Sequence, residues 1–136
     1  MLLTQFRPPL NRLCLEFPAG LVDAAETPEQ AAERELKEET GLRGSVARVT
    51  PIMVADPGMS NANLRVVVVD VDGDAPENLD PQQQLDEGEF IEVHRVPLGA
   101  GFCEALERMC EELGCEVDAR VYSLGLGLSM AGSLSS

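Results

Sequence analysis

Aromatic and basic side chains are scarce in this chain of 136 residues. It contains no tryptophan, one tyrosine and one histidine, and its 10 lysines and arginines stand against 24 aspartates and glutamates. The formal charge of −14 argues against a nucleic-acid or anionic-membrane partner, because phosphate groups recruit lysine and arginine. A phosphate-bearing ligand would need a divalent cation or a few well-placed arginines.

Long apolar runs and paired cysteines are also missing. No stretch is long enough to cross a bilayer, and the first nine residues lack the basic region and apolar run of a signal peptide. The four cysteines form no CxxC pair, so we expect reduced thiols in an intracellular protein. The locations expected are the cytoplasm and, second, the nucleus. Hydrophobic residues make up 44% of the chain. That suffices for one domain over residues 1–136, with a disordered tail from about residue 130.

One helix carries complete end signals. Thr27 is a good N-cap, Pro28 fits the first helical position, and Gln30 completes a capping box. Gly41 suits the left-handed residue that ends a helix. The sequence therefore predicts a helix over residues 28–40.

The remaining elements follow from hydrophobic periodicity. Two further helices are expected over residues 102–113 and 117–130, and residues 75–88 are expected to form a long polar loop. The run at 64–71 is apolar on both faces, which favours a central place in a sheet. The expected strands cover residues 2–6, 13–17, 46–55, 64–71 and 90–96.

Three glutamates of the first helix stand at neighbouring positions. Glu35 and Glu39 are one turn apart, and Glu38 shares their side of the helix. Like charges at this spacing repel, and a hard cation such as Mg²⁺, which takes carboxylate oxygens and substrate phosphates, would offset the repulsion. Taken alone, the cluster favours a solvated acidic face, balanced by Arg34 and Lys37, over a metal site.

The spacing around the cluster decides between these interpretations. Residues 20–42 read G-x5-E-x7-R-E-U-x-E-E-x-G-U, where U is apolar. This pattern resembles the Nudix box at every fixed position. The chain is similar to the Nudix hydrolases, which cleave a nucleoside diphosphate linked to another group. The resemblance implies an α+β fold, the Nudix α/β/α sandwich with a mixed sheet.

Further segments resemble the eukaryotic ADP-sugar (ADP-ribose) pyrophosphatase branch of that family. They include Pro57, about fifteen residues past the box, and the similarity runs from residue 4 to about 128. The other segments are residues 5–9, 15–21, 56–61, 88–90 and 117–122. Against that branch the chain is N-terminally shortened. We expect it to lack the first strands, the N-terminal subdomain, part of the homodimer interface and the aromatic side chains that stack on adenine.

The resemblance assigns roles residue by residue. It implies a Mg²⁺ site, with Mn²⁺ able to replace Mg²⁺. The metal ligands implied are Glu35, Glu39, Glu89 and the carbonyl of Ala19. Glu38 and Glu89 are the implied catalytic carboxylates. The substrate-binding residues implied are Gln5, Arg7, Leu21, Asp56 and Gly58. Arg34 is expected to hold a box glutamate, and Glu89 has the alternative of being an ordinary solvated glutamate.

The function implied is Mg²⁺-dependent hydrolysis of ADP-ribose or a related ADP-sugar to AMP and a sugar phosphate. The alternative is a catalytically weak or inactive Nudix domain that acts as a binding module. Two weaker signals carry no activity. His94 is expected to pair with a carboxylate. The group Cys103, Cys110 and Cys115 is expected to pack in the core.

Overall fold

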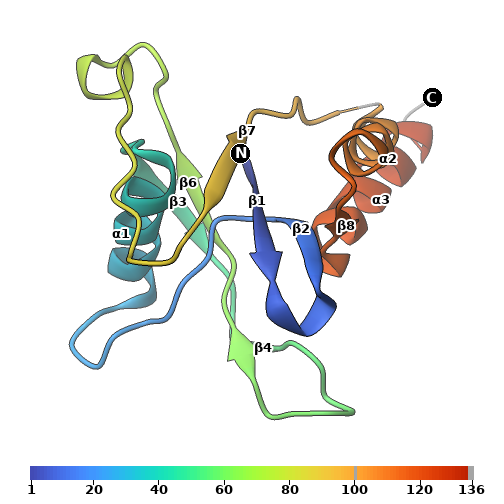
Figure 1. Ribbon diagram of the computed structural model, residues 1–136, viewed down its shortest axis with the longest axis horizontal. Helices are drawn as coiled ribbons and strands as arrows, with labels where there is room; N and C mark the ends of the chain where they lie inside the picture. Colours follow the sequence, from blue (N-terminus) through green and yellow to red (C-terminus); the bar gives the residue numbers. More distant parts are fainter. Residues whose placement is uncertain (100, 135–136) are drawn as a thin grey trace. The chain divides into compact units, whose positions relative to one another are not determined.

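The structure is a computed structural model, and it describes residues 1–99 and 101–134. The chain divides into two compact units (Figure 1). Unit 1 consists of Met1–Pro18 and Leu85–Ser136, and unit 2 of Ala19–Gln84. Unit 2 is therefore an insertion in the sequence of unit 1, and each unit is described by itself.

Unit 1 is built on a mixed four-stranded sheet in the order β7-β1-β2-β8. β1 pairs antiparallel with β2 and with β7, whereas β2 and β8 are parallel. The register places Gln5 opposite Cys14 in one pair and opposite Ile91 in the other. The strands are β1 (Leu2–Arg7), β2 (Arg12–Glu16), β7 (Ile91–His94) and β8 (Glu116–Val117).

Two helices pack with this sheet through an apolar core. They are α2 (Phe102–Leu113) and α3 (Ala119–Leu134). A Cβ added at Gly125 would lie 2.8 Å from the sulfur of Cys103, so the glycine permits close packing of α3 on α2. The core side chains are Leu2, Leu15, Phe102, Leu106, Cys115 and Val121. No helix in the described ranges has both the length and the hydropathy to cross a membrane.

Unit 2 contains α1 (Pro28–Thr40) and two small antiparallel sheets. Thr27 and Gln30 form the predicted capping box, and Gly41 ends the helix with φ +74°. α1 packs against β3 and β6. The sheets pair β3 (Ser45–Val49) with β6 (Val67–Asp70), and β4 (Met53–Val54) with β5 (Asn63–Leu64).

Several predicted elements differ from those observed. Each predicted strand of unit 2 is broken in two, and Pro51, which has no N–H to donate, falls in the first break. The prediction that residues 64–71 form a central strand is wrong: β6 pairs with β3 alone in the described chain, and its residues alternate between half-buried and exposed. An apolar run signals a strand without fixing its number of neighbours.

The C-terminal helix also differs in its bounds. It begins at Ala119 because Val117 is paired in β8, and it continues past Met130 to Leu134. The last two residues of the tail predicted to be disordered lie outside the described residues. His94 is bonded to the hydroxyl of Thr4, at 2.9 Å from its Nε2, rather than to a carboxylate.

The cysteines confirm the prediction of reduced thiols packed in the fold. All four are free, and Cys14, Cys103 and Cys115 are buried. Burial, followed by the negative charge of Glu16, raises the pKa of Cys14 to about 11. Burial and a hydrogen bond with Cys115 raise the pKa of Cys110 to about 12. At neutral pH the raised pKa values favour the protonated form of Cys14 and Cys110.

We therefore expect Cys14 and Cys110 to resist alkylation in the folded protein. The thiolate is the nucleophile, and a rise in pKa from 9.0 to about 11 lowers its concentration at neutral pH roughly a hundredfold at Cys14. Mass spectrometry after iodoacetamide treatment, with and without urea, measures this protection. Equal rates of labelling in the two conditions would contradict it.

Candidate active site

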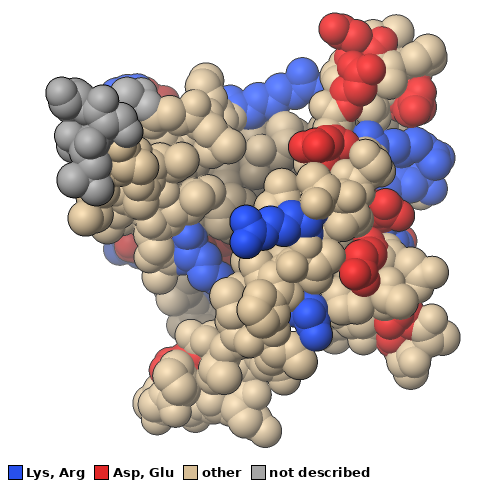
Figure 2. Space-filling model, turned by 180° about the vertical axis from the view of Figure 1, so that it is seen from behind, with Lys and Arg blue, Asp and Glu red and all other residues tan. Residues whose placement is uncertain are grey.

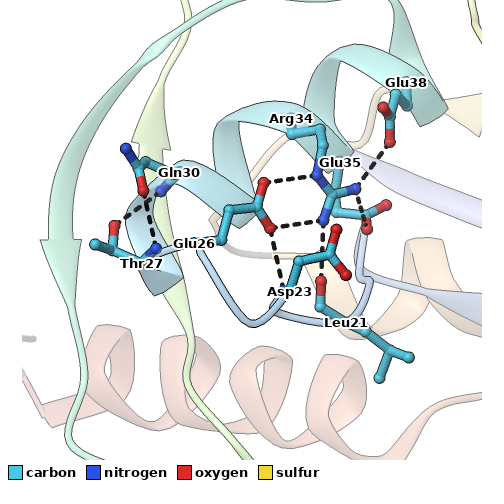
Figure 3. A network of polar contacts seen from close by, with 8 residues as sticks. All are labelled: Leu21, Asp23, Glu26, Thr27, Gln30, Arg34, Glu35 and Glu38. Atoms are coloured by element: carbon cyan, nitrogen blue, oxygen red, sulfur yellow. Dashed lines mark hydrogen bonds and ion pairs between the residues drawn. The ribbon is translucent and has the colours of Figure 1, made fainter.

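The box arginine joins three acidic side chains in and just before α1 (Figure 3). Arg34 Nε and Nη2 donate to the two carboxylate oxygens of Glu26, at 2.8 and 3.0 Å. Arg34 Nη1 donates to Glu35 Oε1 at 2.7 Å and to Glu38 Oε2 at 2.9 Å, and Nη2 also donates to the Leu21 carbonyl at 3.0 Å. The prediction that Arg34 holds a box glutamate is confirmed, for Glu26, Glu35 and Glu38.

This network perturbs the titration of its own members. The hydrogen bonds from Arg34 hold the pKa of Glu26 below its usual value. The hydrogen bonds that Arg34 donates to Glu26, Glu35 and Glu38 raise the pKa of Arg34 itself. The guanidinium thus remains charged, and it offsets the like-charge repulsion that the sequence places on this side of the helix.

The first box glycine lies against Glu35. A Cβ added at Gly20 would fall 1.8 Å from Glu35 Oε1, so the carboxylate occupies the volume that any other residue at this position would fill. The box pairs a glycine with a glutamate fifteen residues later because the loop backbone and the carboxylate approach this closely.

Glu39 is the most buried of the box glutamates. Its exposed fraction is 4%, and its Oε2 accepts a hydrogen bond from the Ala19 backbone N–H at 3.0 Å. Burying a charged carboxylate is costly unless it is paired or coordinates a cation. Glu39 and Ala19, two of the predicted metal-binding residues, are therefore in direct contact.

The donor set of this side of α1 suits a hard divalent cation. Glu35, Glu38 and Glu39 offer carboxylate oxygens, which are the ligands that Mg²⁺ and Mn²⁺ favour. Within residues 1–99 and 101–134, no three acidic, histidine or cysteine side chains converge closely enough to surround one ion. The ion pairs to Arg34 account for the orientation of Glu35 and Glu38.

The other predicted site residues of unit 2 lie on exposed segments. Leu21 is 84% exposed, and its carbonyl binds Arg34. Asp56 and Gly58 occupy a turn in which the Asp56 carbonyl accepts from the N–H groups of Met59 and Ser60, at 3.1 and 2.9 Å. The structure brings Leu21, Glu35 and Glu38 together around Arg34, and it does not bring Asp56 or Gly58 into that network.

Three predicted site residues belong to unit 1. Gln5 and Arg7 share strand β1, and Arg7 forms a bidentate ion pair with Glu16, with both N–O distances 2.7 Å. Glu89 is exposed and follows a turn, where its carboxylate accepts from the Asp86 N–H at 3.0 Å.

Sequence reasoning missed two residues that hold predicted site groups. Glu16 is buried and binds Arg7, and Gln83 donates from its side chain to the Glu39 carbonyl at 2.6 Å. A signal existed for Glu16, because a charged residue directly after the apolar residues 13–15 of a strand needs a partner if it is buried. None existed for Gln83, which is one of three consecutive glutamines in a polar loop.

Surface charge near the site is consistent with the composition. The loop after β6 carries Asp72, Asp74, Glu77 and Asp80. Figure 2 shows acidic side chains gathered over this loop, at the upper right of the view. Such a surface repels polyanions.

Comparison of the sequence with known protein families assigns the chain to one of them. The model of the NUDIX domain matches residues 1–109. The chain belongs to the Nudix family. The match includes segments of both compact units, and it bears out the expected α+β Nudix fold with a mixed sheet.

Individual Nudix proteins resemble the chain over most of its length. An uncharacterized Nudix hydrolase of Schizosaccharomyces pombe is 48% identical over 91% of this chain and 60% of its own. The ADP-sugar pyrophosphatase of Mus musculus is 44% identical over 98% of this chain and 61% of its own. The ADP-ribose pyrophosphatase of Saccharomyces cerevisiae is 44% identical over 96% of this chain and 56% of its own. The chain thus spans about three fifths of the length of these relatives.

The Arg34–Glu26 pair makes stability depend on pH. The pKa of Glu26 is lower in the folded state than in the unfolded state. Its contribution to the free energy of unfolding is therefore fully present above the unfolded pKa and is lost as the pH falls through the folded pKa. We expect Glu26→Gln to lower the free energy of unfolding at about pH 7, and to lower it by less at about pH 3. Urea unfolding at both pH values measures this, with Glu33→Gln on the exposed face of α1 as control. An equal loss at both pH values would contradict the expectation.

Proposed function

We propose that this chain hydrolyses the pyrophosphate bond of ADP-ribose or a related ADP-sugar, releasing AMP and a sugar phosphate. The observation that carries the proposal is the 44% identity, over almost the whole chain, to an ADP-sugar pyrophosphatase and an ADP-ribose pyrophosphatase. The complete box and the contacts of its carboxylates support it.

The metal site proposed is formed by Glu35, Glu39, Glu89 and the Ala19 carbonyl, with Mg²⁺ as the ion and Mn²⁺ able to replace it. A bound divalent cation neutralises the phosphate oxygens and lowers the pKa of an attacking water. Glu39 suits the role because its carboxylate is buried and aimed by the Ala19 N–H. Gly20 holds open the space that Glu35 occupies.

The remaining roles proposed concern the substrate and the proton. Glu38 and Glu89 orient the attacking water, and one of them accepts its proton as the P–O–P bond breaks. Arg7 binds a phosphate, an arrangement supported by the Glu16 ion pair, which fixes the guanidinium plane. Gln5 and Leu21 line the substrate site, and Asp56 and Gly58 contact the terminal ribose.

A panel of nucleotides tests this function. The full chain and Mg²⁺ are incubated with one nucleotide at a time: ADP-ribose, another ADP-sugar or 8-oxo-dGTP. The products of each reaction are separated by chromatography. The last compound is included because an 8-oxo-dGTP diphosphatase of Haemophilus influenzae is 71% identical over 28 residues. We expect AMP from the ADP-sugars and much slower release of any product from 8-oxo-dGTP.

Two outcomes would replace the proposal. Faster cleavage of 8-oxo-dGTP than of either ADP-sugar would assign the chain to a different substrate class. Binding of ADP-ribose by calorimetry without AMP release would support the alternative of a binding module. If the chain releases AMP from ADP-ribose, chelation of the metal by EDTA is expected to stop that release.

A further inference from the structure

The C-terminal end of α1 is closed by residues from far along the chain. The last carbonyls of a helix have no partner within it and need donors from elsewhere. Here the Gly41 N–H donates to the Lys37 carbonyl at 2.8 Å, and the Gln84 N–H donates to the Glu38 carbonyl at 2.7 Å. The Gln83 side chain donates from Nε2 to the Glu39 carbonyl at 2.6 Å.

Residues 81–84 lie directly on this helix end. A Cβ added at Gly41 would fall 2.4 Å from the Gln82 nitrogen and 2.7 Å from the Pro81 carbonyl carbon. Figure 1 shows the yellow segment that contains them passing alongside α1. Two features therefore favour glycine at position 41: its positive φ and the close approach of residues 81–84.

The loop is also fixed on the side that precedes this segment. Asn78 is 3% exposed. Its side-chain Oδ1 accepts from the Arg43 backbone N–H at 2.8 Å, and its Nδ2 donates to the Arg43 carbonyl at 2.9 Å. The same amide donates to the Asp72 carbonyl at 2.7 Å. Gln83 thus extends from a loop held at a buried point, and its contact with Glu39 is preorganised.

Glu39 is consequently held at both of its ends. The Ala19 N–H fixes the carboxylate, and the Gln83 amide fixes the main-chain carbonyl of the same residue. Ala19 is the first residue of unit 2, and Gln84 is its last. Ala19 and Gln83, which lie at or next to the two ends of unit 2, therefore both bind the residue that the proposed function makes a metal ligand.

We propose that Gln83 is a positioning residue for Glu39, acting through the α1 carbonyl that it caps to set the carboxylate for a divalent cation. The inference rests on the proposed metal site and goes beyond it, because it assigns a role to a polar-loop residue outside the box. Outer contacts that orient a metal ligand typically change metal affinity 10- to 100-fold when removed.

The neighbouring glutamine provides a matched control. Gln82 Nε2 donates to Asp80 Oδ1 at 3.0 Å, and both residues are exposed. We would compare Gln83→Met and Gln83→Asn, which remove the donor or shorten its reach, with Gln82→Met. Gln83→Lys serves as rescue, because it returns an N–H donor and places a cation at a helix C-terminus.

The measurements are Mn²⁺ affinity, from the electron paramagnetic resonance of free Mn²⁺, and hydrogen exchange of the Gln84 amide in the metal-free chain. For Gln83→Met and Gln83→Asn we expect Mn²⁺ affinity to fall about tenfold and Gln84 exchange to accelerate. We expect kcat for ADP-ribose to fall more than KM rises. Gln82→Met should match the unsubstituted chain, and Gln83→Lys should recover most of the Mn²⁺ affinity.

The outcomes separate this inference from the proposed function. Weakened Mn²⁺ binding in the Gln83 variants supports it even if no variant hydrolyses ADP-ribose. Faster Gln84 exchange with unchanged Mn²⁺ affinity would reduce Gln83 to a helix cap and overturn the inference. Equal losses in Gln82→Met, or an unsubstituted chain that binds no Mn²⁺, would overturn it as well.

Discussion

Replacing Glu39 with glutamine should lower kcat for ADP-ribose at least ~100-fold at saturating Mg²⁺. The substitution removes one anionic oxygen from a side chain that is only 4% exposed. The amide oxygen of glutamine can still accept the Ala19 N–H, so the loop and the helix keep their contact. The loss should therefore appear in turnover, with little change in the melting temperature.

Glu33→Gln is the matched control for this substitution. Glu33 lies on α1, is exposed and falls at a variable position of the box. We expect its kcat to remain within about twofold of the unsubstituted chain. Glu39→Gln with undiminished turnover, or Glu33→Gln with an equal loss, would remove Glu39 from the metal site.

The second large effect is expected at Glu89. If Glu89 accepts a proton from the attacking water, Glu89→Gln should lower kcat by about 10²- to 10⁴-fold and change KM little. In the structure its carboxylate accepts from the Asp86 N–H, and its own N–H donates to the Asp86 carbonyl at 3.1 Å. The side chain is exposed and held by a local turn, which leaves it accessible to substrate.

Glu87 lies two residues earlier in the same exposed turn and provides the comparison. Glu87→Gln should change neither kcat nor KM. Equal and small effects of the two substitutions would make Glu89 an ordinary surface glutamate. Glu38, whose carboxylate contacts Arg34 at 2.9 Å, would then be the better candidate for the base.

The sequence is most informative where local chemistry decides the structure. The capping box of Thr27 and Gln30, Pro28 at the start and Gly41 at the end define α1 by contacts within a few residues. The grouping of Glu35 and Glu38 around Arg34 follows from helical spacing in the same way. The box and its helix could therefore be predicted almost completely.

Long-range neighbours are less accessible to sequence reasoning. The valines of β6 predict a strand, but their pattern does not reveal that, among the residues that the structure describes, it pairs with β3 alone. The partner of Glu39 at the helix end is Gln83, 44 residues away, and no local signal distinguishes it from Gln82. The Arg7–Glu16 pair joins the two strands of a hairpin diagonally, because the register sets Glu16 opposite Leu3, so the pair becomes visible only in the folded structure.

Hydrolysis of ADP-ribose in ¹⁸O-labelled water tests the central claim most directly. The full chain, Mg²⁺ and ADP-ribose are incubated together, and the products are analysed by mass spectrometry. The account predicts equal amounts of AMP and ribose phosphate, with one solvent oxygen carried by one of the two products, and formation of both at least ~100-fold slower with Glu39→Gln. Unchanged ADP-ribose in the presence of the unsubstituted chain and Mg²⁺ would contradict it, as would products free of ¹⁸O.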